Sequence, residues 1–456
     1  MAAPAAAKGG GKGKPAAGRL DRSFSKDGKL LLAFPPENAG GVGVKYALPF
    51  QFKAGQLVMA PSPGGKTVVA GSTQLVRVLP SGNLDRRFGT RGTVKVPRPA
   101  GMTFVLADIA VDSQGRILLA GTARPQPTSS TPDPLISAAA VIRFDADGNL
   151  DRGFGKEGIL VTDFGIKPPT VPTGEYLGSS LGLMSIAVDS QGRPVLTGAA
   201  VIRASFCRSS ETVTNGFVAR LTSAGAPDPS FGEGGLRTIS DLASFGEANV
   251  LRSKALLAVG VKRSGCEYKS PGAPVLLTEF GPEGNLRPSF GLAGFRSVNF
   301  DSAPAVTLTP AGKILLLGGK HGKSQLIVRL TRSGGLDASF GRTGRLRVIT
   351  QRLVSYSTIG VDRRERILLG GQAEKQVRGK HTNSLRRSSF VLTRLTEEGS
   401  RDRSFGRRGS VRTGFGGPSS AAAAQLYVDA KGRITVVSGL LGTGGGFALA
   451  RYLGGR

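Results

Sequence analysis

The two histidines are the first residues to test for chemistry, because the chain has only two His and two Cys among its 456 residues. His321 lies in the sequence Gly-Lys-His-Gly and His381 in Gly-Lys-His-Thr, and neither has a carboxylate close by. A structural zinc site usually takes four ligands, and a catalytic triad needs a nucleophile and an acid as well as a histidine. The sequence therefore predicts no catalytic residue, no metal site and no cofactor, and the two histidines are kept only as binding candidates.

A run of alternate oxygen donors, Asp145, Asp147, Asn149 and Asp151, has the spacing of a calcium loop. It lacks the later bidentate Glu of an EF-hand loop, and the corresponding segments elsewhere in the chain lack these carboxylates. Asp shortly before Gly is also typical of a tight turn, in which Asp bonds its own backbone and Gly takes a positive φ. We therefore predict a hairpin turn at this run.

The phrase Gly-x-Leu-Asp-x-x-Phe-Gly recurs along the chain with a spacing of about sixty residues, and an internal period of this kind indicates a repeat architecture. Its seven copies contain Phe24, Phe88, Phe154, Phe231, Phe290, Phe340 and Phe405. An Asp after a turn caps backbone amides, and a Phe at fixed register packs between neighbouring units. We therefore expect the repeated Asp and Phe, including Asp85, Asp151 and Asp337, to be structural.

Two further phrases complete the repeat. A turn with Gly-Lys or Gly-Arg leads into an apolar run that ends in Gly, as in QGRILLAG at Gln114, and a strand such as AAVIRF at Ala139 follows it. An apolar run before the turn adds another strand, so each unit has four short strands, which is the blade of a β-propeller. The first-strand runs IAVD, IAVD, IGVD and LYVD are interpreted as apolar up to the turn Asp, at Asp112, Asp189, Asp362 and Asp429. That interpretation disfavours inward-facing catalytic carboxylates.

The two ends of the chain indicate how the ring closes. Residues 18–34 supply a fourth strand with no first three strands before it, and residues 447–453 supply a third strand with no fourth strand after it. Pairing the two removes both open edges. We predict an all-β, seven-bladed β-propeller of four-stranded antiparallel blades, closed by pairing of the N-terminal strand with the C-terminal blade. Residues 1–17 are expected to form a flexible basic leader without the apolar stretch of a signal peptide, and residues 18–456 one propeller domain.

Taken together, the phrases Gly-x-Leu-Asp-x-x-Phe-Gly-x-x-Gly and Asp-x-x-Gly-Lys/Arg-Ile-x-x-x-Gly resemble the delta-60 repeat family of bacterial β-propeller proteins. The resemblance runs from residue 18 nearly to residue 454. It departs from the pattern at Arg287, where Asp is expected, at Pro227 and Arg401, where Leu is expected, and at the worn turn before Lys254, so the fourth blade fits least well. The resemblance implies the fold and a secreted or surface protein, and very little chemistry.

The loops after the second strand of each blade vary most in length, and variable loops on a rigid ring are the usual layout of a binding face. We expect this face to be cationic, although a solvated rim is the alternative. The binding candidates in these loops are Arg124, Arg203, Arg208, Lys262, Arg263, Lys320, His321, Lys323, Arg378, Lys380 and His381.

The two cysteines fall in the same loop of consecutive blades. Equivalent loops of neighbouring blades lie close together, so we predict a disulfide between Cys207 and Cys266. The alternative is two unrelated thiols. A disulfide favours an oxidising compartment, which means export or the cell envelope.

The charge of the chain indicates the class of partner. Sixty-one Lys and Arg against 31 Asp and Glu give a formal net charge of +30, spread along the whole chain. Such a field attracts anionic polymers or surfaces, and an Arg-rich solvated surface is the alternative. No apolar stretch is long enough for a membrane span.

We therefore expect a secreted or envelope-located, monomeric, non-enzymatic binding propeller. Its cationic face would hold an anionic partner such as an envelope polymer, a polysaccharide or an acidic protein. The alternatives are a propeller enzyme of the lactonase, lyase or glycosidase type and a nucleic-acid-binding propeller.

Overall fold

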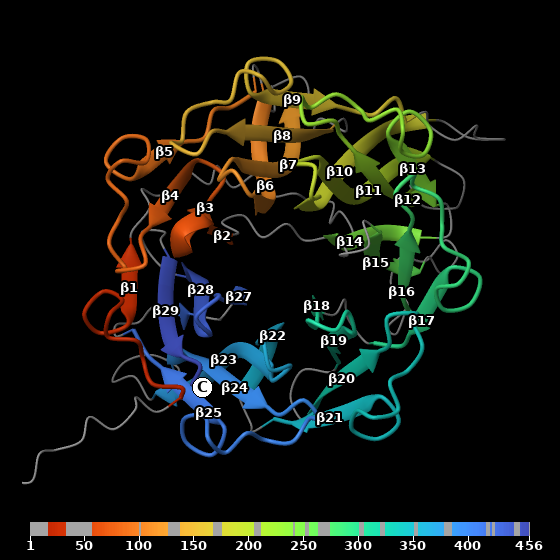
Figure 1. The fold of residues 1–456 in the computed structure, drawn as a ribbon. Helices are drawn as coiled ribbons and strands as arrows, with labels where there is room; N and C mark the ends of the chain where they lie inside the picture. Colours follow the sequence, from red (N-terminus) through yellow and green to blue (C-terminus); the bar gives the residue numbers. More distant parts are fainter. Residues whose placement is uncertain are drawn as a thin grey trace, which may run out of the picture.

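The fold is a ring of seven antiparallel sheets arranged around a common centre (Figure 1). The computed structural model describes residues 17–32, 57–99, 102–125, 137–166, 176–204, 211–239, 242–250, 255–262, 274–300, 305–319, 324–350, 354–377, 385–415, 420–421, 425–441 and 447–455. Within these ranges every element is a strand except the 3-10 turn η1 (Pro63–Gly65). The prediction of an all-β, seven-bladed propeller is confirmed.

The first four blades follow the chain in order. Blade 1 contains β2 (Val58–Ser62), β3 (Lys66–Ala70), β4 (Gln74–Val78) and β5 (Thr93–Lys95). Blade 2 contains β6 (Met102–Val111), β7 (Ile117–Pro125), β8 (Ala138–Phe144) and β9 (Ile159–Thr162). Blade 3 contains β10 (Tyr176–Val188), β11 (Pro194–Ala204), β12 (Glu211–Arg220) and β13 (Leu236–Ile239). Blade 4 contains β14 (Leu242–Val250), β15 (Leu256–Lys262), β16 (Val275–Phe280) and β17 (Phe295–Val298).

The remaining blades complete the circle. Blade 5 contains β18 (Ala305–Leu308), β19 (Ile314–Gly318), β20 (Ser324–Leu330) and β21 (Arg345–Ile349). Blade 6 contains β22 (Val354–Val361), β23 (Ile367–Val377), β24 (Leu385–Leu395) and β25 (Ser410–Thr413). Blade 7 combines β27 (Gln425–Val428), β28 (Arg433–Leu441) and β29 (Phe447–Leu453) with β1 (Lys29–Leu32), and the short β26 (Ser420–Ala421) also pairs with β28.

Ring closure joins the two ends of the chain. β1 pairs with β29 in an antiparallel register that matches Lys29 with Ala450 and Leu32 with Phe447. The first described strand is therefore the fourth strand of the last blade, as expected from the sequence. This pairing gives the last blade an outer fourth strand, as in the other blades, and covers the edge of β29.

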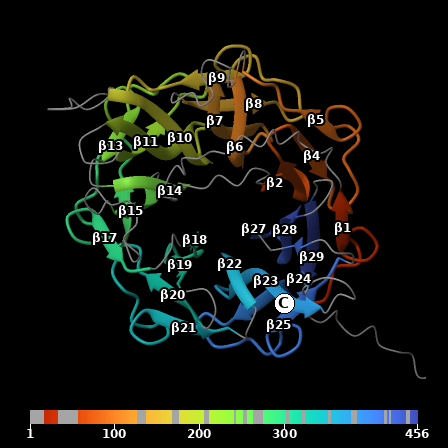
Figure 2. The same cartoon turned by 180° about the vertical axis from the view of Figure 1, so that it is seen from behind.

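Burial along the strands follows their place in the blade. First strands lie toward the centre of the ring and fourth strands lie at the outer rim (Figures 1 and 2). The second strand of blade 5, β19, is a continuous apolar run, and all five of its residues are buried because both of its faces pack against neighbouring blades. In the outer strand β21 buried and exposed residues are mixed. The core thus lies between the blades.

The repeated motif joins each blade to the next, as blade 5 illustrates. The guanidinium of Arg329 in β20 donates from Nε to Asp337 at 2.8 Å, lies 4.6 Å from the ring centre of Phe340, and donates from Nη1 to the carbonyl of Glu397 in blade 6 at 2.7 Å. Gly399 in the next copy has φ of 97°, and a Cβ there would lie 3.1 Å from the Phe340 ring. The repeated Gly is therefore required by both its backbone angle and its contact with the preceding blade.

The same ion pair recurs in five further blades, as Arg77–Asp85, Arg143–Asp151, Arg220–Asp228, Arg394–Asp402 and Arg451–Asp21. In blade 4 the charges are exchanged, because Glu279 occupies the arginine position and pairs with Arg287 at 2.9 Å. The departure at Arg287 is thus matched by a compensating change eight residues upstream. Phe88, Phe154 and Phe340 are fully buried, which confirms that the repeated Asp and Phe are structural.

The run that starts at Asp145 forms a hairpin turn. One carboxylate oxygen of Asp145 accepts hydrogen bonds from the backbone amides of Asp147 and Asn149, both at 2.9 Å, and the other accepts from the Asn149 side chain at 3.1 Å. Asp151 is engaged elsewhere, in its ion pair with Arg143. The oxygens are therefore used within the protein, and the prediction of a turn is confirmed.

Candidate functional site

The loop-bearing face of the ring is set by the direction of the strands. In antiparallel blades of one common order, all second strands run the same way and end on one face. Four of these second strands carry a cation at or near their last residue, namely Arg124 in β7, Arg203 in β11, Lys262 in β15 and Lys375 in β23. Blades 2, 3, 4 and 6 therefore each bring a basic residue to the same face.

The structure describes this face in part. Arg124 is half-buried at the end of β7, where it is the register partner of Thr103. Arg203 is the second-last residue of β11, and Lys262 is the last residue of β15. The other binding candidates lie outside the described residues, and these are Arg208, Arg263, Lys320, His321, Lys323, Arg378, Lys380 and His381. Cys207 and Cys266 lie outside them too, so the disulfide stays a prediction.

Blade 6 extends its middle hairpin toward this face. β23 and β24 stay paired over 11 positions each, and the register matches Lys375 with Arg387 and Gln376 with Arg386. Two basic residues, Lys375 and Arg387, thus occupy directly paired positions at this end of the hairpin.

The first strands of two blades carry a carboxylate that sequence reasoning missed, Asp108 in β6 and Glu247 in β14. Asp108 lies in β6 at a register shift between Leu106 and Asp108. Its carboxylate accepts hydrogen bonds from the Ser185 hydroxyl at 2.8 Å, the Ile186 amide at 3.1 Å and the Ile109 amide at 2.8 Å. Asp108 immediately precedes the apolar run IAVD that ends at Asp112, so it lies outside the run on which the sequence interpretation was based.

Asp108 connects blade 2 to blade 3 through these bonds. Burial raises the pKa of its carboxyl above the ordinary value, and the three hydrogen bonds only partly oppose this effect. The signal in the sequence was a single Asp inside the apolar stretch of residues 104–111, where an unpaired charge is costly and therefore needs hydrogen-bond donors. The geometry gives Asp108 an inter-blade structural role.

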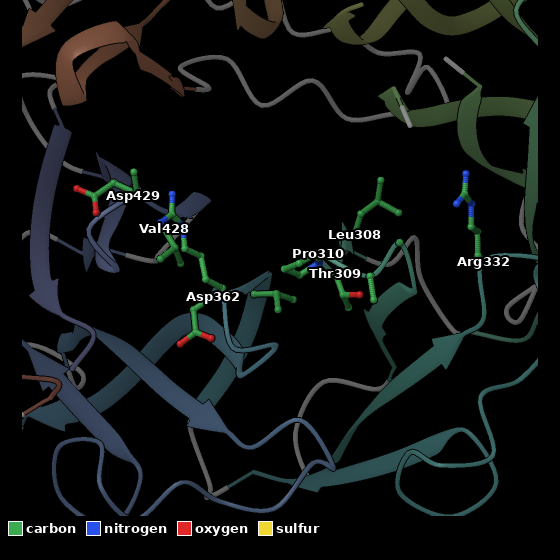
Figure 3. A pocket seen from close by; sticks show the side chains of 12 residues that line it. Leu308, Thr309, Pro310, Arg332, Asp362, Val428 and Asp429 are labelled. Atoms are coloured by element: carbon green, nitrogen blue, oxygen red, sulfur yellow. The ribbon is translucent and has the colours of Figure 1, made fainter. Parts of the chain in front are cut away.

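A cavity of about 600 Å³ lies beside the first hairpin turns of blades 5, 6 and 7 (Figure 3). Its wall is formed by the first hairpin turns of these blades, with Leu308, Pro310 and Val428 as apolar lining and Arg332 at one side. This volume lies within the range of small-molecule sites.

The two carboxylates of this cavity are already engaged. Asp362 pairs with Arg366 and Asp429 with Arg433, both at 2.6 Å, and each Asp also accepts from backbone amides of its own turn. They hold the turns in shape, and neither is left to act as a general acid or base in this arrangement.

Asp337, a carboxylate of the repeated motif, has a low pKa because it too is engaged by neighbouring groups. Burial alone would raise the pKa of Asp337, but hydrogen bonds from Ser339 and Lys313 and the charge of Arg329 outweigh it and lower the pKa well below the ordinary value. Charged carboxylates locked in this way stabilise the blades. Within the ranges that the structure covers, no group of three or more His, Cys, Asp or Glu side chains is placed to hold a metal ion.

Comparison with known proteins gives no family. No family model matches the chain, and no curated protein matches it. A protein of unknown function from Dyadobacter fermentans is 13% identical, with a TM-score of 0.40, and the match covers 86% of this chain and 99% of the other. An α-L-arabinanase from Penicillium chrysogenum, complexed with arabinobiose, is 11% identical, with a TM-score of 0.40. The match covers 92% of this chain and 98% of the arabinanase.

The Nup133 β-propeller domain of Vanderwaltozyma polyspora is 9% identical, with a TM-score of 0.37, and the match covers 93% of this chain and 97% of that domain. Similarity at these identities transfers no activity. Among the described residues no helix is long and apolar enough to cross a membrane.

Proposed function

We propose that this chain is a non-enzymatic, exported binding propeller of the delta-60 type that holds an anionic polymer on its loop-bearing face. The observation that carries the proposal is the common position of Arg124, Arg203, Lys262 and Lys375 at the ends of second strands on one face. A ring that gathers cations from four blades on one side suits a partner with many negative charges, such as an envelope polysaccharide or an acidic protein. The repeat phrases support the delta-60 assignment, and the net charge of +30 supports the class of partner.

The use of carboxylates in the described turns supports binding over catalysis. The Asp residues of the cavity turns and of the motif form ion pairs with arginines. A glycosidase would instead need two carboxyl groups on either side of the bond that it cleaves. Asp108, a carboxylate in a first strand, favours the enzyme alternative. If Asp108→Asn abolished a lactonase, lyase or glycosidase activity of the protein without loss of folding, the proposal would be wrong.

Binding to defined polymers tests the proposal. Polygalacturonate, poly-glutamate and a DNA duplex of similar charge are titrated at several salt concentrations. We expect the variant Arg124→Gln/Arg203→Gln/Lys262→Gln to bind polygalacturonate or poly-glutamate roughly tenfold more weakly than wild type at low salt, with a shallower salt dependence.

The matched control is Arg86→Gln/Arg87→Gln/Arg91→Gln, which removes three exposed cations from the rim of blade 1. Equal losses in both variants would show that the net charge, and not this face, carries binding. Tight binding to DNA alone would favour the nucleic-acid alternative.

A further inference from the structure

The seam where the ring closes contains a second cationic surface, away from the loop-bearing face. A groove of about 1390 Å³ lies on the outer side of the ring between the N-terminal segment that leads into β1 and the segment that leads into β25 of blade 6. β1 and β25 are neighbours on the outer rim in both views (Figures 1 and 2). The cationic residues that line the groove are Arg19, Arg22, Lys26, Lys29, Arg407 and Arg412.

The charges in this groove are not balanced. Its two carboxylates are engaged, because Asp21 pairs with the buried Arg451 at 2.8 Å and Asp27 pairs with Lys29 at 3.6 Å. Arg19, Arg22 and Arg407 are exposed and have no ion-pair partner in the part of the chain that the structure describes. The groove is therefore an uncompensated positive surface, and it attracts anions.

The lining residues indicate the chemistry of the ligand. Guanidinium groups predominate among the cations, and their planar forks match the oxygens of a phosphate group. No aromatic side chain is among the described residues of the groove wall, so no platform is present on which a nucleobase or a sugar ring would stack. A chain that carries a phosphate in every unit and has no ring fits this surface best.

We propose that the seam groove binds inorganic polyphosphate, and that the bound polymer strengthens the closure of the ring. One wall of the groove is the N-terminal segment and the other is blade 6, and the backbone amide of Gly406 donates to the carbonyl of Ala17 across them at 2.9 Å. Cations from both walls face one groove, so their repulsion opposes closure when no anion is present. A polyanion that spans both walls replaces this repulsion by attraction and stabilises the closed ring by mass action.

Titration of the full-length protein with sodium polyphosphate of defined chain length tests the proposal. We expect salt-dependent binding, and we expect Arg19→Gln/Arg22→Gln/Arg407→Gln to weaken it roughly tenfold at low salt and to reduce the slope of log affinity against log salt by about one for each phosphate-binding cation removed. The rim control Arg86→Gln/Arg87→Gln/Arg91→Gln, with the same change in net charge, should retain binding close to wild type. Glutamine keeps most of the side-chain stem, so the packing of the variants is little changed.

A second measurement tests the link to ring closure. Polyphosphate should raise the unfolding temperature of the wild type and slow hydrogen exchange of the β1 amides, Lys29–Leu32, and both effects should disappear in the seam variant. Orthophosphate at the same phosphorus concentration should have neither effect, because it does not span the two walls. If the seam variant and the rim control lose binding equally, or if β1 exchange is unchanged by polyphosphate, the proposal is wrong.

The loop-face variant separates this inference from the proposed function. Arg124→Gln/Arg203→Gln/Lys262→Gln should still bind polyphosphate at the seam, and the seam variant should still bind polygalacturonate or poly-glutamate on the loop-bearing face. Loss of polyphosphate binding in the loop-face variant alone would place the polyphosphate site on that face and overturn the seam assignment.

Discussion

Arg451, in β29, donates from Nε to the carboxylate of Asp21 at 2.8 Å, although the two residues are 430 positions apart in the sequence. Both side chains are buried. In the other blades the equivalent partners are only 8 positions apart, as in Arg394 and Asp402. The same local motif thus serves at this seam as a link between the two ends of the chain.

Removal of the Asp21 carboxylate should weaken ring closure. Asp21→Asn leaves Arg451 buried without its counter-ion, and breaking a buried pair in this way typically costs about 3–5 kcal/mol. We expect a lower free energy of unfolding by denaturant and faster hydrogen exchange at the β1 amides. Asp402→Asn breaks the equivalent pair in blade 6 and is the control, since it should lower stability without this specific effect on β1. Equal exchange of β1 in the two variants would contradict the seam role.

Acid should destabilise the ring through the motif carboxylates. For Asp21, Asp228 and Asp402, burial raises the pKa, but hydrogen bonds from the following Ser and the neighbouring arginine charge outweigh burial, and the pKa falls below the ordinary 3.8. A carboxyl whose folded pKa is depressed contributes stability above its unfolded pKa, and this contribution is lost as the pH falls through the folded value. We therefore expect the unfolding free energy to drop steeply below about pH 4.

Equilibrium unfolding measured as a function of pH checks this expectation. The variant Asp21→Asn should show a shallower acid dependence than the wild type, because one of the depressed groups is gone. An acid limb of equal steepness in both proteins would exclude a contribution from Asp21.

The cysteine pair can be tested without a structure of its loops. If Cys207 and Cys266 form a disulfide, protein purified from its native host should not react with an alkylating agent until a reductant is added, and its intact mass should rise on reduction. Cys207→Ser should then leave Cys266 reactive without reductant. Alkylation of both thiols in the native protein would contradict the bond and would weaken the argument for an exported protein.

The fold could be predicted because its information repeats. In each copy of the motif, Asp and Gly specify a turn and Phe specifies a buried contact. Departures from the motif in one blade, such as those in blade 4, therefore leave the period visible in the other copies. The arginine partner was missed, although Arg77 and Arg329 each precede the motif Asp by eight positions. A charged residue in an alternating strand is typical of a solvent-facing position. The burial of these arginines is evident only in the fold, where the motif Phe lies under the guanidinium and the next blade supplies a carbonyl.

The binding face was less predictable because its loops do not repeat. The loops that follow β7, β11 and β23 differ in length and composition, so no period relates Arg124 to Lys375. Their common position follows only from the shared strand direction of the blades. The seam groove depends on the approach of the segments around Arg19 and Arg407, which are far apart in the sequence, and no local pattern encodes such a pair.

The exchanged pair in blade 4 provides the sharpest test of the motif. Glu279→Arg alone would place a second cation beside Arg287 at a buried position, and we expect it to lower the unfolding free energy by about 3 kcal/mol or more. The double variant Glu279→Arg/Arg287→Asp restores the arrangement of the other blades, in which the arginine also lies over the motif Phe, here Phe290. We expect it to recover wild-type stability or exceed it.

The coupling between the two changes is measured by a double-mutant cycle in denaturant unfolding. Arg287→Asp alone is the second single variant and should also destabilise, since it places two carboxylates together. If the double variant is no more stable than the two single changes predict by simple addition, then the pair at 279 and 287 is not the equivalent of Arg329 and Asp337. Full recovery would instead show that the polarity of this pair is interchangeable within the blade, and that only its complementarity is required.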